Sequence, residues 1–298
     1  MTFQPIKGVI TPTVTPFDDA GEVNLDAIKP MIDFLIGHGI KGIYPLGTTG
    51  EGVLLSNEER KRVAEATVKA VDGAVPVIVH TGAITTRDTI ALTRHAQDVG
   101  ADAVAVITPY YFQLSDDALE QHFSAIADST PNLPIYLYKF PDVTGNTISL
   151  ELMTRLANKH ENIVGLKDSS GDLLTLFATN HLHNGQFNTA MGPDELIVGG
   201  MAMGIEASVS GHSNLVPEII VGICSAMADN NLEEALRYQH TLNAIRNVLR
   251  AGDWLPLVKG LMIERGLPVG GVRRPLLTAP DALIQTCAKE IRDLGVSL

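Results

Sequence analysis

The sequence is poor in cysteine and contains no long apolar run. Its 298 residues include two cysteines, Cys224 and Cys287, and neither stands in a spacing typical of a metal site or a redox motif. This usage fits a reducing compartment, and the first residues show no charged-then-apolar signal pattern, so we expect a cytoplasmic protein. No apolar stretch approaches the ~20 residues of a membrane helix, which argues against a membrane protein.

Positive charge is also scarce. The chain has 22 Lys and Arg against 34 Asp and Glu, which gives a net charge of -12. Such a surface repels phosphate backbones and anionic lipids, so neither nucleic acid nor a membrane is expected as a partner. What is present instead is a globular composition, 45% hydrophobic and 19% charged, with enough apolar residues for a sizeable core.

Short apolar runs alternate with longer amphipathic ones over residues 1–230. The predicted strands are Gly8–Val14, Gly42–Leu46, Val75–His80, Ala103–Ile107, Ile135–Tyr138, Ile163–Lys167, Asn188–Met191 and Ala207–Ser210. The predicted helices between and after them are Leu25–Ile36, Asn57–Val71, Arg87–Val99, Asp116–Ala127, Leu150–Ala157, Leu173–Leu182, Asp194–Met203 and Val216–Met227. This alternation, at roughly 25–30-residue spacing, predicts an α/β fold of the (β/α)₈ TIM barrel type.

Residues 231–298 exceed what a barrel requires. They contain three further predicted helices, Leu232–Leu249, Leu255–Glu264 and Ala282–Leu294. We therefore predict a barrel domain over 1–230 and a C-terminal helical extension over 231–298. An open doubly wound sheet is the rival fold, but it requires a glycine-rich phosphate loop after the first strand, where this chain has Thr11-Pro12-Thr13-Val14-Thr15-Pro16.

The carboxyl ends of barrel strands, with the loops after them, normally carry the functional groups. The segments at these ends are Gly47–Glu51, Thr108–Tyr111, Tyr138, Lys167, Gly192–Glu195 and Ser210–Asn214. Hydroxyls, phenols and one amine therefore converge on one mouth, without an obvious set of metal ligands.

Lys167 ends a short apolar run, where an amine is costly to keep charged. Such a lysine either pairs with an acid or loses its proton and becomes a nucleophile that can form a Schiff base with a carbonyl compound. If Lys167 points into the barrel, strand alternation sends Ile163 and Gly165 inward and Val164 and Leu166 toward the helices. Gly165 would then leave space beneath the amine.

The neighbouring strand ends supply two further groups. Alternation turns Tyr138 inward beside the amine, where its phenol can shuttle protons to and from Schiff-base intermediates. The loop that contains Thr48 and Thr49 offers backbone N–H groups and two hydroxyls, which suit a carboxylate. Asp168 follows Lys167 and should point elsewhere, into a salt bridge.

Together these motifs resemble the dihydrodipicolinate synthase / N-acetylneuraminate lyase family of pyruvate-dependent class I aldolases. The matching segments span nearly the whole chain: Gly8–Phe17, Gly47–Glu51, Thr108–Tyr111, Tyr138–Gly145 and Gly165–Asp168. The resemblance implies that Lys167 forms the Schiff base with pyruvate or another 2-oxo acid, and that Tyr138 and Thr49 transfer protons. It implies no metal and no organic cofactor.

The resemblance also assigns binding residues and an assembly. Thr48 and Thr49 would bind the pyruvate carboxylate, and the carbonyl of Val209 would face the bound pyruvate. Tyr111 matches a tyrosine that is lent across a dimer interface to the neighbouring subunit's site. Members of the family are usually homotetramers, built as dimers of dimers.

The departures from the family pattern bear on the substrate. The synthases carry an arginine where Val143 stands, and an apolar residue there is similar to the sugar-acid lyases. Asp194 and Glu195 match an acidic pair that contacts sugar hydroxyls in neuraminate lyases. The serine that follows in that pattern is Gly211 here, with Ser210 beside it. Lys139 either contacts an acidic substrate or is only a surface charge.

We therefore expect a lyase that reversibly cleaves a 2-keto-3-deoxy sugar acid to pyruvate and an aldehyde. Alternatives within the family are 4-hydroxy-tetrahydrodipicolinate synthase, which Val143 disfavours, N-acetylneuraminate lyase and a keto-deoxy sugar acid dehydratase. A metal-dependent class II aldolase would need a convergent His/Asp/Glu set that the strand ends do not show. A catalytically silent barrel that binds 2-oxo acids is disfavoured by the intact set of Lys167, Tyr138, Thr48 and Thr49.

Overall fold

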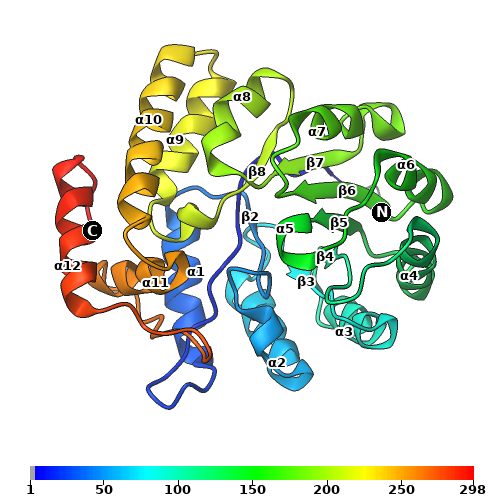
Figure 1. Ribbon diagram of the computed structural model, residues 1–298, viewed down its shortest axis with the longest axis horizontal. Helices are drawn as coiled ribbons and strands as arrows, with labels where there is room; N and C mark the ends of the chain where they lie inside the picture. Colours follow the sequence, from blue (N-terminus) through cyan, green and yellow to red (C-terminus); the bar gives the residue numbers. More distant parts are fainter. Residues whose placement is uncertain (1–3) are drawn as a thin grey trace.

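The computed structural model describes residues 4–298 and contains one parallel sheet of eight strands (Figure 1). The strands are β1 (Gly8–Thr11), β2 (Gly42–Ile43), β3 (Ile78–His80), β4 (Ala103–Ile107), β5 (Ile135–Lys139), β6 (Ile163–Asp168), β7 (Asn188–Met191) and β8 (Ala207–Val209). Their order is β2-β1-β8-β7-β6-β5-β4-β3, and a single bridge between Ile43 and Val77 joins the two edges. The sheet therefore closes on itself, and the predicted (β/α)₈ TIM barrel is confirmed.

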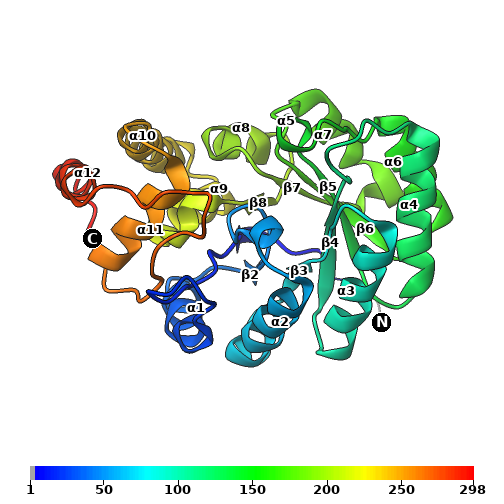
Figure 2. The same ribbon diagram turned by 60° about the horizontal axis from the view of Figure 1, so that its bottom comes forward.

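The helices surround this sheet, and Figure 2 shows them outside the strands. They are α1 (Ile28–Gly37), α2 (Asn57–Val71), α3 (Thr86–Asp98), α4 (Asp116–Ser129), α6 (Leu150–Lys159), α7 (Leu173–Thr179), α8 (Ile197–Ala202) and α9 (Pro217–Ala228), with a short α5 (Pro141–Thr144) at the mouth. Side-chain caps start several of them, because the hydroxyls of Ser56, Ser115 and Ser149 accept hydrogen bonds from backbone N–H groups of the first turn.

Several predicted boundaries were wrong at the mouth of the barrel. β1 ends at Thr11 and β2 at Ile43, three residues before the predicted ends in each case. Leu46 has a φ of 69°, which turns the chain out of the strand and into the loop that follows. The sequence also missed α5, and the predicted helix from Leu25 begins as a separate 3₁₀ turn, Leu25–Ala27.

The predicted alternation on β6 was wrong below Gly165. Ile135 pairs with Ile163 but Tyr136 pairs with Gly165, so Val164 is the extra residue of a bulge. Val164 consequently joins the side chains inside the barrel, while Ile163 packs in the outer core with the helices. A Cβ on Gly165 would lie 2.6 Å from the Tyr136 ring, so that ring occupies the space we had predicted beneath the amine.

Three helices follow the barrel, as the sequence predicted: α10 (Leu232–Leu249), α11 (Trp254–Glu264) and α12 (Asp281–Asp293). Figure 1 places α10 beside α9 and α12 at the outer edge of the molecule. They are tied to the barrel, since Lys259 of α11 donates a hydrogen bond to the carbonyl of Thr15 over 2.9 Å. Among residues 4–298, no helix is both long and apolar enough to cross a membrane.

Candidate active site

A cavity of about 630 Å³ opens at the carboxyl ends of the strands. Seven of the predicted site residues line it: Thr48, Thr49, Tyr138, Lys167, Asp194, Glu195 and Val209. A larger hollow of about 740 Å³ lies at the other end of the barrel, near Asn162 and Val164. The residues around that second hollow include no lysine, tyrosine, serine or threonine, so only the first has an amine or hydroxyl nucleophile to offer.

The amine of Lys167 lies between two phenol rings. Its Nζ is 4.0 Å from the centroid of the Tyr138 ring and 4.5 Å from that of Tyr44. Tyr138 is paired in register with Lys167 on the adjacent strand, and the residue of Lys167 is 5% exposed. Within residues 4–298 no carboxylate comes into ion-pair range of this amine. The sequence left open that Lys167 pairs with an acid, and the described residues offer no acid for such a pair.

The phenol of Tyr138 connects the amine to the loop after β2. Its hydroxyl lies 3.4 Å from Thr48 Oγ1, which is long for a hydrogen bond between two hydroxyls. Tyr44, behind the amine, is buried, and burial raises the pKa of its phenol well above the ordinary value, with the nearby Tyr138 adding to the effect. Tyr44 thus stays neutral and supplies an apolar wall for the amine.

Glycines shape the loop that carries Thr48 and Thr49. A Cβ on Gly47 would lie 2.7 Å from the Tyr44 ring, and one on Gly50 would lie 2.9 Å from the carbonyl oxygen of Thr13. Both positions are therefore restricted to glycine by close approach. Thr15 donates a hydrogen bond from its hydroxyl to the carbonyl of Gly50 over 2.6 Å, which fixes the loop against the segment that follows β1.

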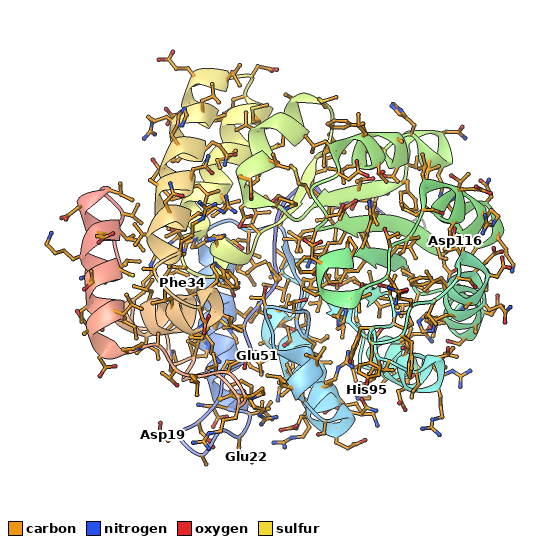
Figure 3. All side chains as sticks on the ribbon, viewed as in Figure 1. Asp19, Glu22, Phe34, Glu51, His95 and Asp116 are labelled. Carbon is orange, nitrogen blue, oxygen red and sulfur yellow. The ribbon has the colours of Figure 1, made fainter. Side chains whose placement is uncertain are left out.

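A buried carboxylate anchors the end of this loop (Figure 3). Glu51 is 2% exposed, its Oε1 lies 3.2 Å from Lys259 Nζ, and its Oε2 accepts a hydrogen bond from the backbone N–H of Arg273 over 2.7 Å. Burial lowers the pKa of Lys259 to about 8, although Glu51 opposes this shift. The C-terminal extension thereby holds the threonine loop in place.

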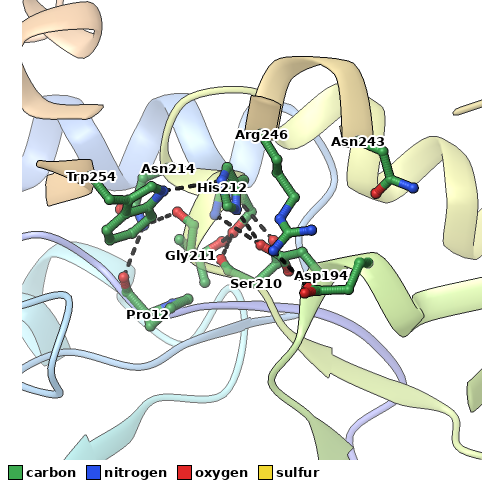
Figure 4. A network of polar contacts seen from close by, with 12 residues as sticks. Pro12, Asp194, Ser210, Gly211, His212, Asn214, Asn243, Arg246 and Trp254 are labelled. Carbon is green, nitrogen blue, oxygen red and sulfur yellow. Dashed lines mark hydrogen bonds and ion pairs between the residues drawn. The ribbon is translucent and has the colours of Figure 1, made fainter. Parts of the chain in front are cut away.

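The far wall of the cavity is acidic and aromatic (Figure 4). Asp194 is hydrogen-bonded to His212 Nδ1, and Trp254 Nε1 donates to His212 Nε2 over 3.0 Å. Glu195 forms an ion pair with Arg246 over 2.8 Å. Among residues 4–298, no group of three or more His, Cys, Asp or Glu could hold a metal ion.

The comparison with family models agrees with the motifs and with this geometry. The model of the dihydrodipicolinate synthetase family matches residues 5–293. The chain belongs to the dihydrodipicolinate synthetase family. The resemblance inferred from the motifs is confirmed. The protein is accordingly a carbon–carbon lyase of the pyruvate-dependent class I aldolase type.

Similar proteins within this family differ in their named activities. The probable 2-dehydro-3-deoxy-D-pentonate aldolase YjhH of Escherichia coli is 35% identical over 267 residues, 88% of each chain. The 4-hydroxy-tetrahydrodipicolinate synthase of Oceanobacillus iheyensis is 34% identical over 286 residues, 96% of each chain. The crystal structure of YagE from E. coli in complex with pyruvate matches with a TM-score of 0.92 at 31% identity, covering 98% of this chain and 99% of that one.

In the present protein, four of the predicted site residues do not line the cavity. Lys139 faces outward in a buried ion pair with Asp168, 3.3 Å away, which is the salt bridge predicted for Asp168. Val143, on α5, is 50% exposed. Ser210 is fully buried, and its hydroxyl accepts a hydrogen bond from the backbone N–H of Ser213. Tyr111 is 86% exposed, and its role at a subunit interface stays a prediction.

The sequence analysis did not predict four residues that lie at this site: Tyr44, His212, Arg246 and Trp254. Strand alternation could have found Tyr44, which stands two residues after the inward Gly42, and His212 stood in a segment already singled out. Arg246 and Trp254 carry no local signal, because they reach the mouth from helices that follow the barrel.

Proposed function

We propose that the protein is a class I aldolase that cleaves a 2-keto-3-deoxy sugar acid into pyruvate and an aldehyde, and that adds the two in reverse. The observation that carries the proposal is the buried amine of Lys167 against the Tyr138 phenol, in a cavity that also contains Thr48 and Thr49. A desolvated amine is a nucleophile, and a phenol beside it is a proton carrier.

The proposed reaction begins when Lys167 attacks the carbonyl carbon C2 of the substrate. Loss of water gives the protonated Schiff base, while Thr48 and Thr49 bind the substrate carboxylate and the carbonyl of Val209 faces the bound pyruvate portion. Tyr138, with Thr49, removes the proton from the C4 hydroxyl. The C3–C4 bond then breaks, the aldehyde leaves, and the bonding electrons form an enamine. Protonation at C3 and hydrolysis release pyruvate and the free lysine.

Two features favour a sugar acid over the substrate of a synthase. Val143 stands where the synthases carry an arginine, and an uncharged side chain cannot hold a second carboxylate. The far wall carries Asp194 and Glu195; Glu195 pairs with Arg246, and Asp194 pairs with His212. An acidic wall accepts hydrogen bonds from hydroxyls and repels a second carboxylate.

A substrate panel tests the proposal. Purified protein is offered 2-keto-3-deoxy sugar acids of different length, N-acetylneuraminate, and pyruvate with aspartate semialdehyde, and pyruvate release or consumption is measured. We expect pyruvate release to be fastest with a 2-keto-3-deoxy acid, and no release from the Lys167→Ala variant. Efficient condensation with aspartate semialdehyde would identify a synthase and contradict the use we make of Val143. Loss of water from the sugar acid without pyruvate release would identify a dehydratase.

A further inference from the structure

Lys139 joins two carboxylates beside the cavity. Its amine lies 3.3 Å from Asp168 Oδ2 and 3.6 Å from Asp172 Oδ2. The residue is 5% exposed and is not among those that line the cavity. Within residues 4–298 no other lysine, arginine or histidine comes into ion-pair range of either acid. One buried amine at the end of β5 therefore links the end of β6 to the start of α7.

The two acids stand at the ends of the β6–α7 loop, which we define as residues 169–172. Asp168 is the last residue of β6. Asp172 is the N-cap of α7, where its carboxylate accepts a hydrogen bond from the backbone N–H of Thr175 over 3.1 Å. The residues between the two acids line the cavity: Ser169, Ser170 and Gly171. The bridge formed by Lys139 therefore spans a segment that forms part of the cavity wall.

Other contacts hold mainly the first half of this loop. The backbone N–H of Ser169 donates to the carbonyl of Lys139 over 2.9 Å, and that of Ser170 donates to Asp168 Oδ1 over 2.7 Å. The chain then turns through Gly171, which has a φ of 77°, and a Cβ at this position would meet nothing within 4 Å. Packing does not hold the loop at Gly171, so the ion pair of Lys139 is what ties the far end of the loop to the sheet.

The charges explain why this bridge matters. Asp168 is 2% exposed, and its Oδ2 has no hydrogen bond within residues 4–298, so the amine of Lys139 is what compensates it. Hydrogen bonds from Thr175 and the charge of Lys139 hold the pKa of Asp172 below its ordinary value, so this carboxylate is ionised at neutral pH. Without the cation, the two acids would repel each other and the loop between them would shift.

We infer that Lys139 is a positioning residue that holds the β6–α7 loop against the aldehyde portion of the substrate. Three strands separate β6 from β2 in either direction around the barrel, so this loop faces Thr48 and Thr49 across the mouth. The pyruvate carboxylate belongs to the threonine side, which leaves the aldehyde portion for the opposite wall. The inference rests on the proposed function, which supplies the aldehyde, and Lys139 acts only through the loop.

Aldol addition of pyruvate to the best aldehyde of the substrate panel tests the inference, with kcat and the KM for the aldehyde as readouts. Lys139→Met keeps the length of the side chain and removes its charge. It should raise this KM about tenfold or more, because a misplacement of about 1 Å can cost about 10²-fold. The pyruvate concentration that half-saturates the borohydride-trapped adduct should stay as in the wild type. Amide hydrogen exchange in residues 169–172 should become faster.

Further variants separate positioning from a general loss of stability, since Lys139→Met leaves a buried acid unpaired. Lys139→Arg keeps the charge and can donate to both acids, so it should retain most of the wild-type behaviour. Asp172→Asn removes one charge and can still cap α7, so it should raise the KM less than Lys139→Met does. Arg155→Met is the matched control, because Arg155 also bridges two acids, Glu120 and Glu151, outside the cavity. Its KM should equal that of the wild type.

The outcomes distinguish the two possible failures. If the wild type forms no adduct, or forms it and accepts no aldehyde, the proposed function fails and the inference falls with it. If the wild type is active, the inference alone is overturned by an unchanged aldehyde KM in Lys139→Met, by an equal rise in the pyruvate requirement, or by a Lys139→Arg variant that is no better.

If Lys139→Met does not fold, a wild-type aldehyde KM in Asp172→Asn overturns the inference, and a raised one supports it. If Lys139→Met folds, the supporting result is a raised aldehyde KM that Lys139→Arg largely restores, with pyruvate binding unchanged.

Discussion

Lys139 and Lys167 lie on neighbouring strands and are each 5% exposed, yet their surroundings differ completely. Strand alternation turns Lys139 outward, where Asp168 and Asp172 lie 3.3 and 3.6 Å from its amine. It turns Lys167 inward, against Tyr138 and away from any carboxylate of residues 4–298. Lys139 is held in ion pairs, whereas Lys167 packs on a phenol ring without one, so the two lysines are suited to structure and to chemistry respectively.

The Tyr138 phenol is expected to move protons after the Schiff base has formed. Tyr138→Phe keeps the ring that packs on Lys167 and removes the hydroxyl near Thr48. The variant should therefore still form the pyruvate adduct, while turnover falls about 10²–10⁴-fold, the usual contribution of acid–base catalysis. Steady-state kinetics together with adduct mass spectrometry check this, and a turnover close to that of the wild type would remove Tyr138 from the mechanism.

The pairing of Lys167 with Tyr138 could be predicted from the sequence, because alternation and sequential strand order are local rules. The placement of Lys139 could not, since both a substrate contact and a solvated charge fit the same residue. The structure gives a third outcome, a buried ion pair. Trp254 could not be predicted for another reason. Its contact with His212 joins residues 42 positions apart, and the local sequence pattern does not predict such a contact.

At the scale of elements, the threonine loop depends on the C-terminal helices through Glu51. Lys259→Met would leave this buried carboxylate without its cation, and breaking one side of such a pair typically costs about 3–5 kcal/mol of unfolding free energy. We expect that loss in urea denaturation, with a raised KM for pyruvate because the loop is less firmly held.

The double variant Glu51→Gln/Lys259→Met is the control for this prediction. It removes both charges, and the amide oxygen of the substituted side chain can still accept the hydrogen bond from the Arg273 backbone, so it should recover most of the lost stability. If the double variant lost as much unfolding free energy as the two single variants, Glu51→Gln and Lys259→Met, lose together, Glu51 and Lys259 would not act as a pair.

The bulge in β6 marks where prediction of the elements failed. Alternation holds from Gly165 to Lys167, which is why the site was found, but one extra residue at Val164 reverses the faces below it. That register depends on fitting the Tyr136 ring against Gly165, with the phenol donating to Asn188 Oδ1 over 2.6 Å. Such packing is set in three dimensions and leaves no trace in the local pattern.

For the whole molecule, a buried histidine should make folding sensitive to acid. Burial lowers the pKa of His122 to about 4 from an ordinary 6.5. Between these values the unfolded chain binds a proton that the folded protein does not, so stability falls as pH decreases through this window and is unaffected by this group above it. The slope for one proton is about 1.4 kcal/mol per pH unit.

His122→Asn isolates this contribution. Unfolding free energies measured in urea at about pH 7.5 and about pH 4.5, on either side of the ordinary histidine pKa, should differ less in the variant than in the wild type, because the variant lacks the group that titrates. An equal loss of stability in both proteins would assign the acid sensitivity to other groups.

The barrel itself could be predicted at this scale, because alternating strand and helix patterns over 230 residues admit few folds. What the pattern could not give is the shape of the mouth, since loops and C-terminal helices build it. Lys259 is another buried lysine, and burial lowers its pKa to about 8, so the choice of Lys167 as the nucleophile has to be tested against Lys259.

Borohydride reduction in the presence of pyruvate, followed by peptide mass spectrometry, tests the central claim most directly. The account predicts a reduced pyruvyl adduct on the peptide that contains Lys167, and no adduct in a Lys167→Ala variant whose circular dichroism matches that of the wild type. The absence of any adduct, or an adduct carried by Lys259 instead, would contradict it.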